Sequence, residues 1–294
     1  MICAGKVYVE YPSRSDVFTL WPVGDLHVMS RGFSRSYFQR DRERILSSNR
    51  NIVIGMGDYA EFISPKGNDK RWDFTQLSND VTAAELNDVG RAATTRVVDL
   101  WRPMRARTIG MLMGNHEHSY EKHQATVMDN ITNALDVWHM GYECLFDLVF
   151  VRMDNQRDVR IAIRPPVKYR ARYVGRDTYT ARVHAHHGRG AARTPGGKLN
   201  MLYGFVQRWN ADIFLAAHVH DQIAKPFIKL EGNRAGTKVV ERRVVGAITG
   251  SYLRTYTDNV NPSYGEVSAY DGVPLGAARV NIHPHERRLS VETE

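Results

Sequence analysis

The first half of the chain alternates short apolar runs with amphipathic stretches. The apolar runs predict three buried strands, at residues 17–23, 51–56 and 108–113. Residues 36–46 and about 79–100 carry apolar side chains near helical spacing, and a further helix is expected over about 121–135. This order of strand, helix, strand, helix and strand is typical of βαβ units, so it predicts a largely parallel sheet.

The second half is richer in strands. Alternating or apolar segments predict strands at 144–153, 159–164, 178–185, 212–216, 224–230, 238–248 and 279–291. One helix is expected between them, at about 199–209. The chain has no internal repeat, low-complexity tract or linker, so residues 1–294 are expected to form a single domain. The long segment between the second and third strands predicts a helical insertion or cap around 62–105.

The composition is that of a globular protein, with 43% apolar, 24% charged and 10% aromatic residues. No apolar run approaches the roughly 20 residues that span a bilayer, and the N-terminus lacks the order of a signal peptide. Two cysteines, Cys3 and Cys144, do not make a disulfide framework. We therefore expect a cytoplasmic protein with free thiols and no membrane partner. Nothing in the sequence indicates an oligomeric state.

The net charge of +8 is concentrated in one stretch of the chain. Between residues 151 and 193 lie eleven basic residues, ten of them arginines: Arg152, Arg157, Arg160, Arg164, Lys168, Arg170, Arg172, Arg176, Arg182, Arg189 and Arg193. Three acids oppose them in this stretch, Asp154, Asp158 and Asp177. An excess of arginine favours anionic partners such as nucleic acid or phosphorylated substrates. The alternative is an ordinary solvated surface that is basic.

Polar side chains recur where the predicted strands end. They are Asp25 and His27, Asp58, Asn115 and His116, His186 and His187, and His218 and His220. Because the carboxyl ends of parallel strands meet in one crevice, we expect these side chains to lie close together. Imidazole, carboxylate and amide oxygen ligands suit divalent ions such as Mn²⁺, Fe²⁺ or Zn²⁺. A single histidine of this kind is more often structural, but a set with more ligands than one tetrahedral ion takes suits two ions that share a carboxylate.

The order of these motifs resembles that of the calcineurin-like metallophosphoesterases. The matching blocks are Gly24-Asp25-Leu26-His27, Gly57-Asp58, Gly114-Asn115-His116-Glu117, His186-His187-Gly188 and Ala217-His218-Val219-His220. The resemblance implies an α/β fold, a four-layered α/β/β/α sandwich of two mixed sheets flanked by helices. Ala217 stands where the family usually has glycine, which is tolerated if the backbone there is not at positive φ.

The resemblance also implies a role for each site residue. Asp25, His27 and His220 would hold one metal ion, Asn115, His186 and His218 the other, and Asp58 would bridge them. His116 would be catalytic rather than a ligand, touching the scissile phosphate or protonating the leaving oxygen. Independently of the resemblance, Glu117 is a candidate for orienting a histidine, and the alternative is an exposed acid in a loop. His184, His186 and His187 compete for one ligand position; the family pattern favours His186, with His187 second. The cofactor would be a pair of divalent ions, Mn²⁺ first, with Fe²⁺, Zn²⁺ or Ni²⁺ as alternatives.

These features predict a two-metal hydrolase of phosphoester bonds. The basic stretch favours phosphodiesters of nucleic acid or nucleotides, the chemistry of a nuclease or phosphodiesterase. A phosphomonoesterase acting on proteins or small molecules is the alternative. A non-catalytic nucleic-acid-binding module with a structural metal site is a third hypothesis. His116 argues against it, because a structural site does not need a histidine that is not a ligand.

Overall fold

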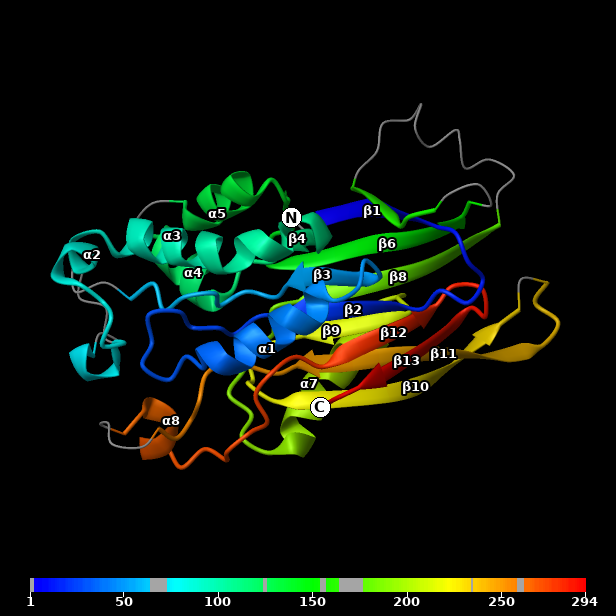
Figure 1. The fold of residues 1–294 in the computed structure, drawn as a ribbon. Helices are drawn as coiled ribbons and strands as arrows, with labels where there is room; N and C mark the ends of the chain where they lie inside the picture. Colours follow the sequence, from blue (N-terminus) through cyan, green and yellow to red (C-terminus); the bar gives the residue numbers. More distant parts are fainter. Residues whose placement is uncertain are drawn as a thin grey trace.

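Two mixed β-sheets form the centre of the protein, and helices cover their outer faces (Figure 1). The computed structural model describes residues 3–63, 73–123, 126–153, 157–163, 177–233, 235–257 and 262–294. Within these ranges one sheet has seven strands and the other has six.

The seven-stranded sheet has the strand order β10-β11-β9-β8-β6-β1-β7. Its strands are β1 (Cys3–Tyr11), β6 (Glu143–Arg152), β7 (Arg160–Ile163), β8 (Thr178–His186), β9 (Ile213–Ala216), β10 (Gln222–Gly232) and β11 (Val239–Thr249). β8 runs parallel to β9, and β9 runs parallel to β11, so these three strands end at the same edge of the sheet.

The six-stranded sheet has the strand order β13-β12-β2-β3-β4-β5. Its strands are β2 (Phe18–Val23), β3 (Asn51–Gly55), β4 (Thr108–Met111), β5 (Trp138–His139), β12 (Arg279–His283) and β13 (Arg288–Glu292). β2, β3, β4 and β5 are mutually parallel neighbours. The predicted series of βαβ units is therefore confirmed in this sheet.

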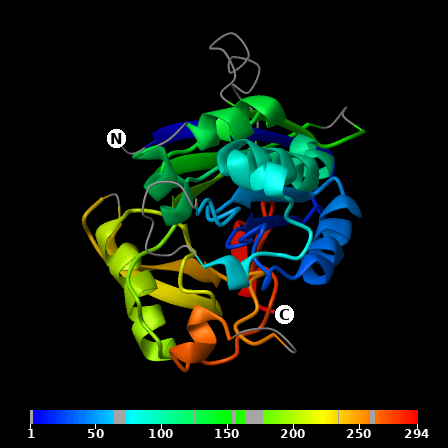
Figure 2. The ribbon, with the colours of Figure 1, turned by 90° about the vertical axis from the view of Figure 1, so that its left-hand side faces the viewer.

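Four helices of nine or more residues flank the sheets within the described ranges. They are α1 (Arg35–Leu46), α3 (Val89–Trp101), α5 (Val127–Leu135) and α7 (Pro195–Arg208). α1, α3 and α5 pack on the six-stranded sheet, whereas α7 packs on the seven-stranded sheet. Figure 2 shows α7 (yellow-green) and α1 (blue) on opposite sides of the molecule. The remaining described helical elements are short: α2 (Ala83–Asn87), α4 (Asn115–Glu121), α8 (Tyr264–Val267), η1 (Phe74–Gln76) and η2 (Arg102–Arg107).

Alternation along the strands divides the apolar side chains between separate cores. Ile52 and Ile54 of β3 share the core between the sheets with Ile213 and Leu215 of β9. Phe214, between the last two, points the other way into the core under α7. Burying each such side chain contributes about 1.5–3 kcal/mol, so the pairing of the sheets is strongly favoured. The layers are helices, sheet, sheet and helix, which is the expected α/β/β/α sandwich.

Capping residues explain two differences from the predicted helices. Residues 79–100 were expected to form one helix, but Asp88 leaves the helical backbone and its carboxylate accepts the N–H of Arg91 at 3.1 Å, so α3 starts anew there. α7 begins before the expected residue 199, because Thr194 accepts the N–H of Gly197 at 3.2 Å and Pro195 fits the first helical position.

The segment expected to form an insertion, around 62–105, has two different surroundings in its described part. α3 belongs to the helical layer on the six-stranded sheet. Ahead of it, Leu77 forms a β-bridge with Ser30, and the side-chain amide of Gln76 donates to the carbonyl of Pro262 at 3.0 Å. Residues 64–72 lie outside the described residues. None of the described helices combines the length and apolar character needed to cross a bilayer.

Candidate metal centre

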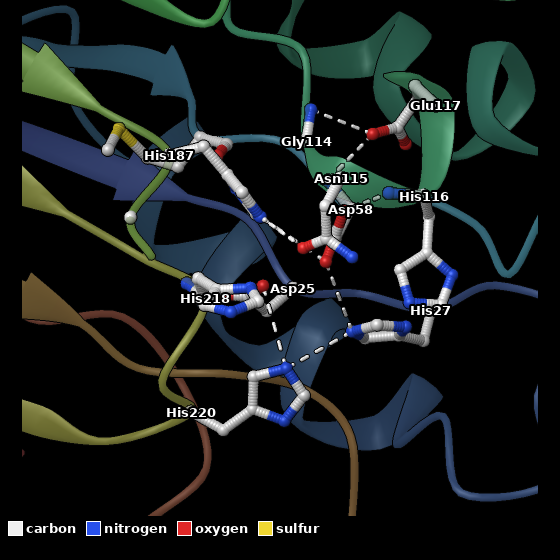
Figure 3. A network of polar contacts seen from close by, with 12 residues as sticks. Asp25, His27, Asp58, Gly114, Asn115, His116, Glu117, His187, His218 and His220 are labelled. Atoms are coloured by element: carbon white, nitrogen blue, oxygen red, sulfur yellow. Dashed lines mark hydrogen bonds and ion pairs between the residues drawn. The ribbon is translucent and has the colours of Figure 1, made fainter. Parts of the chain in front are cut away.

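Six of the seven metal-ligand candidates from the sequence lie together where strands of both sheets end (Figure 3). They are Asp25 and His27 after β2, Asp58 after β3, Asn115 after β4, and His218 and His220 after β9. The convergence expected at the carboxyl ends of parallel strands is therefore observed, and both sheets contribute to it.

Five of these residues have left-handed backbone conformations. The φ angles are 48° at Asp25, 51° at His27, 51° at Asp58, 72° at His218 and 47° at His220. Such a conformation costs a non-glycine residue about 1–3 kcal/mol and persists only where the surroundings enforce it. Here the loops hold one another, since the N–H of His27 donates to the carbonyl of Asp58 at 3.1 Å and the N–H of His218 donates to Asp25 Oδ2 at 2.9 Å. Strain concentrated in one cluster is typical of a functional site.

Asp25, His27 and His220 form the first group of facing ligand atoms. The Nε2 atoms of His27 and His220 are 3.2 Å apart, and Nε2 of His220 lies 3.6 Å from Oδ1 of Asp25. That Oδ1 atom is buried and has no hydrogen-bond partner in the described part of the chain. A buried carboxylate oxygen without a donor, facing two imidazole nitrogens, is suited to a divalent cation.

Asp58, His187 and His218 form the second group, and Asn115 lies beside it. Nε2 of His187 lies 3.3 Å from Oδ2 of Asp58 and 3.0 Å from Oδ1 of Asn115. The same Asp58 oxygen lies 4.0 Å from Nε2 of His27, in the first group. Asp58 is therefore positioned between the two groups, as Figure 3 shows.

The structure brings His187 to this cluster instead of His186, which corrects the choice made from the family pattern. Side chains alternate along β8, so His184 and His186 share the face that packs on α7. The His186 ring stacks on Phe205 with centroids 4.7 Å apart, and the His184 ring stacks on Trp209 at 5.0 Å. His187 comes one residue later, points to the opposite side and is completely buried.

Backbone carbonyls determine which nitrogen of two histidines faces the cluster. Nδ1 of His187 lies 2.7 Å from the carbonyl oxygen of Met56, and Nε2 of His218 lies 2.9 Å from that of Gly190. A carbonyl oxygen only accepts, so these ring nitrogens carry the hydrogen. In the neutral rings, the form that binds a metal ion, the lone pairs are then on Nε2 of His187 and Nδ1 of His218. Fixing the tautomer in this way is typical of histidines that bind metals.

Glu61 is a site residue that the sequence analysis missed. Its carboxylate lies 3.2 Å from Nδ1 of His27 and 3.6 Å from Nδ1 of His116, and its own carbonyl accepts from Nδ1 of His116 at 2.7 Å. Burial alone would raise the pKa of Glu61, but His27 and His116 outweigh burial and lower it. A carboxylate behind an imidazole orients the ring and increases its basicity. The available signal was an acid three residues after Asp58, in the loop that follows a predicted strand.

His116, the predicted catalytic residue, lies at the edge of the cluster. Its ring contacts that of His27 edge to face, with centroids 4.8 Å apart. Its backbone N–H donates to Oδ1 of Asp58 at 2.9 Å. One ring nitrogen of His116 also lies close enough to His27 and Asp58 for the three to form a further group of ligand atoms. The position allows either a catalytic role or ligation.

Glu117 ties the loops of the cluster together through the backbone instead of orienting a histidine. It is completely buried, and its carboxylate accepts the N–H groups of Asp58, Tyr59 and Gly114 at 3.0, 2.8 and 2.9 Å. The loop after β3 is thereby fixed to the start of α4. Ala217, the departure from the family pattern, has a negative φ, so its methyl group causes no backbone strain.

Burial and charge pairing shift the pKa values of the cluster in opposite directions. Burial would raise the pKa of both aspartates, but His187 lowers that of Asp58 well below its usual range, and His220 lowers that of Asp25. Burial would lower the pKa of His187, but the carboxylates of Asp58 and Asp25 raise it to about 10. Without a cation, the cluster therefore holds a proton on His187 beside an ionised Asp58. A divalent cation would compete with this proton.

The residues of the cluster fit divalent cations at two adjacent places. The donor set mixes imidazole nitrogens with carboxylate and amide oxygens, which suits Mn²⁺, Fe²⁺ or Zn²⁺ better than Ca²⁺. The buried Oδ1 of Asp25 and the fixed lone pairs of His187 and His218 support the same conclusion.

The basic stretch of residues 151–193 is only partly described. Arg164, Lys168, Arg170, Arg172 and Arg176 lie outside the described residues. Of the others, Arg182 donates to Asp147 at 2.8 Å. The guanidinium of Arg193 lies 5.1 Å from the ring centroid of Tyr270. Arg189 is exposed, on the loop that follows His187.

Comparisons with solved structures include two likenesses of fold. No protein-family model matches the chain, and no curated protein matches it. One of the two is a Staphylococcus aureus protein predicted to be a 5′-nucleotidase, solved in complex with alpha-ketoglutarate, which is 14% identical in sequence. The alignment covers 95% of this chain and 53% of that protein, and the TM-score is 0.46. The other is a predicted phosphoesterase from Streptococcus pneumoniae, which is 13% identical in sequence. The alignment covers 91% of this chain and 84% of that protein, and the TM-score is 0.31. The chain spans about half the length of the first protein. At these identities and scores we infer function from the residues of the cluster alone.

Proposed function

We propose that the protein is a phosphoesterase that depends on two divalent metal ions. The observation that carries the proposal is the position of Asp58, whose Oδ2 faces His187 at 3.3 Å and His27 at 4.0 Å. A carboxylate between two groups of ligands is what a pair of ions requires. When bound, such ions lower the pKa of a water molecule and neutralise the charge of a phosphate.

The proposed ligands fall into two sets with one shared member. They are Asp25, His27 and His220 for one ion, Asn115, His187 and His218 for the other, and Asp58 for both. Glu61 supports the first set, because its carboxylate lies behind the His27 ring. Manganese is the first choice of metal, and Fe²⁺, Zn²⁺ or Ni²⁺ the alternatives.

His116 is proposed to protonate the leaving oxygen. Its Nδ1 donates a hydrogen bond to the carbonyl oxygen of Glu61 at 2.7 Å. Nε2 is therefore the atom that would give up a proton. The Glu61 carboxylate, 3.6 Å from the ring, would stabilise the protonated imidazole. The oxygen of the attacking water forms a new P–O bond and loses one proton to solvent. The ester P–O bond breaks, and the leaving oxygen takes the proton of His116.

The substrate is proposed to be a phosphodiester of nucleic acid or a nucleotide. The support is electrostatic, from the net charge of +8 and the arginines between residues 151 and 193. Such a field attracts polyanions and makes their binding dependent on salt.

The test is a panel of substrates with protein reconstituted in Mn²⁺. The proposal expects faster hydrolysis of bis-p-nitrophenyl phosphate than of p-nitrophenyl phosphate, cleavage of single- or double-stranded DNA, and loss of both in chelator. Rapid hydrolysis of the monoester without cleavage of DNA would favour a phosphomonoesterase. Binding of DNA without hydrolysis of any substrate, whichever metal is added, would favour a non-catalytic module instead.

A further inference from the structure

Arg189 lies on the loop between β8 and α7, beside the second group of ligand atoms. It comes two residues after His187. The carbonyl of the next residue, Gly190, accepts a hydrogen bond from Nε2 of His218 at 2.9 Å. The chain around Arg189 is therefore tied directly to a proposed metal ligand.

The backbone on both sides of Arg189 is fixed. Gly188 and Gly190 have φ angles of 114° and 90°, which residues other than glycine rarely adopt. A Cβ on Gly188 would lie 2.3 Å from the carbonyl oxygen of Ala217, so the loop packs tightly against the residues before His218. The N–H of Arg189 also points to the sulfur of Met201 at 3.3 Å. The backbone is thus preorganised, while the Arg189 side chain is exposed.

Within the described ranges, the charge of Arg189 has no neutralising partner. No carboxylate in the described ranges forms an ion pair with it, and within these ranges its backbone N–H, and not its guanidinium, makes a hydrogen bond. Other cations of this region are engaged. Nζ of Lys198 is buried and lies 3.1 Å from Oδ2 of Asp221, and the Arg193 guanidinium lies over the ring of Tyr270.

We propose that Arg189 binds a second phosphate group of the substrate, next to the phosphate that is hydrolysed. It would select phosphoesters with at least two phosphates, as in a nucleotide chain or a nucleoside bisphosphate. This inference rests on the proposed phosphoesterase function. A guanidinium presents parallel N–H donors that match two oxygens of one phosphate. An exposed arginine that has no carboxylate partner among the described residues is ready to make these bonds.

Two chromogenic esters that differ by one phosphate test this role. Thymidine 5′-(p-nitrophenyl phosphate) and its 3′-phosphorylated form release p-nitrophenol from the same bond. The wild-type protein should have the lower KM for the 3′-phosphorylated ester. Arg189→Ala should raise that KM by about 10- to 100-fold, the usual effect of losing a charged hydrogen-bond pair, with kcat unchanged. Arg189→Ala should hydrolyse the ester without the second phosphate with the same KM and kcat as the wild type.

Arg193→Ala is the matched control, because it removes a cation from the same loop that is already engaged with Tyr270. Its effect should be small and equal for the two esters, because Arg193 contributes only to the general positive field. Added salt should raise the KM of the 3′-phosphorylated ester more steeply in the wild type than in Arg189→Ala. Equal effects of Arg189→Ala on both esters, with wild-type activity intact, would overturn the role of Arg189 alone. Hydrolysis of neither ester by the wild type, with each of the proposed metals, would overturn the proposed function and this role with it.

Discussion

The substitution Glu117→Gln should change how the stability of the metal-free protein depends on pH. Glu117 is completely buried and accepts three backbone N–H groups, from Asp58, Tyr59 and Gly114. Burial is the main cause that raises its pKa, and the charge of Asp58 adds to it, so the pKa rises from 4.5 to about 7. Glutamine has nearly the same shape but does not titrate.

The direction of the effect follows from proton linkage. A carboxyl group with a higher pKa in the folded than in the unfolded chain binds its proton more tightly when folded. Its contribution to stability is therefore complete below about pH 4.5 and is lost as the pH rises to about 7. The difference between these pKa values, at about 1.4 kcal/mol per unit, corresponds to about 3 kcal/mol. The wild type should lose this contribution with rising pH, and Glu117→Gln should not.

Urea unfolding followed by circular dichroism, in chelator at pH 5, 6, 7 and 8, measures the effect. The free energy of unfolding of the wild type minus that of Glu117→Gln should fall by about 2–3 kcal/mol between pH 5 and pH 8. Glu85→Gln is the control. The hydrogen bond from Arg96 lowers the pKa of Glu85 to about 2. The contribution of Glu85 to the free energy of unfolding is therefore already complete above about pH 4.5. The difference between the wild type and Glu85→Gln should stay constant over this pH range. Parallel pH curves for the wild type and Glu117→Gln would refute the reasoning.

Three further predictions concern the histidines of the cluster. His187→Asn should remove the ion of the second group. His186→Asn should leave the metal content unchanged, because the His186 ring stacks on Phe205 outside the cluster. Equal loss of metal in both variants would show that the assignment is wrong. His116→Ala should keep both ions and lower turnover by about 10²–10⁴-fold, and loss of metal in this variant would make His116 a ligand. The apparent affinity for Mn²⁺, measured by calorimetry, should increase about tenfold per pH unit between pH 6 and 9. The reason is that the ion displaces the proton that the carboxylates hold on His187. An affinity independent of pH would contradict this.

Local patterns predicted much of the fold, and long-range pairing limited the rest. The strands β2, β3 and β4 and the helix α1 follow from apolar runs and helical spacing within single segments. β1 was not predicted, although Val7 and Val9 alternate in the manner of a strand and lie in the central core. Its neighbours are β6 and β7, which lie more than 130 residues along the chain, and short-range periodicity carries no information on such pairing.

The convergence of the candidate site residues could be predicted where a residue type and a strand end coincide. Asp25, Asp58 and His218 are such cases. The choice between His186 and His187 depends on the residue at which β8 leaves the sheet, and an error of one residue reverses the face to which the side chain points. The contact of Glu61 with His27 joins two loops that follow different strands, so no pattern within either loop predicts it.

Metal content tests the central claim most directly. The wild type and Asp58→Asn would be reconstituted with Mn²⁺, desalted and measured by mass spectrometry of bound metal. The position of Asp58 between the two groups predicts two ions per chain in the wild type and weakened binding of both in Asp58→Asn. No bound ion in the wild type, or two tightly bound ions in Asp58→Asn, would contradict the assignment of the cluster as a dinuclear metal centre.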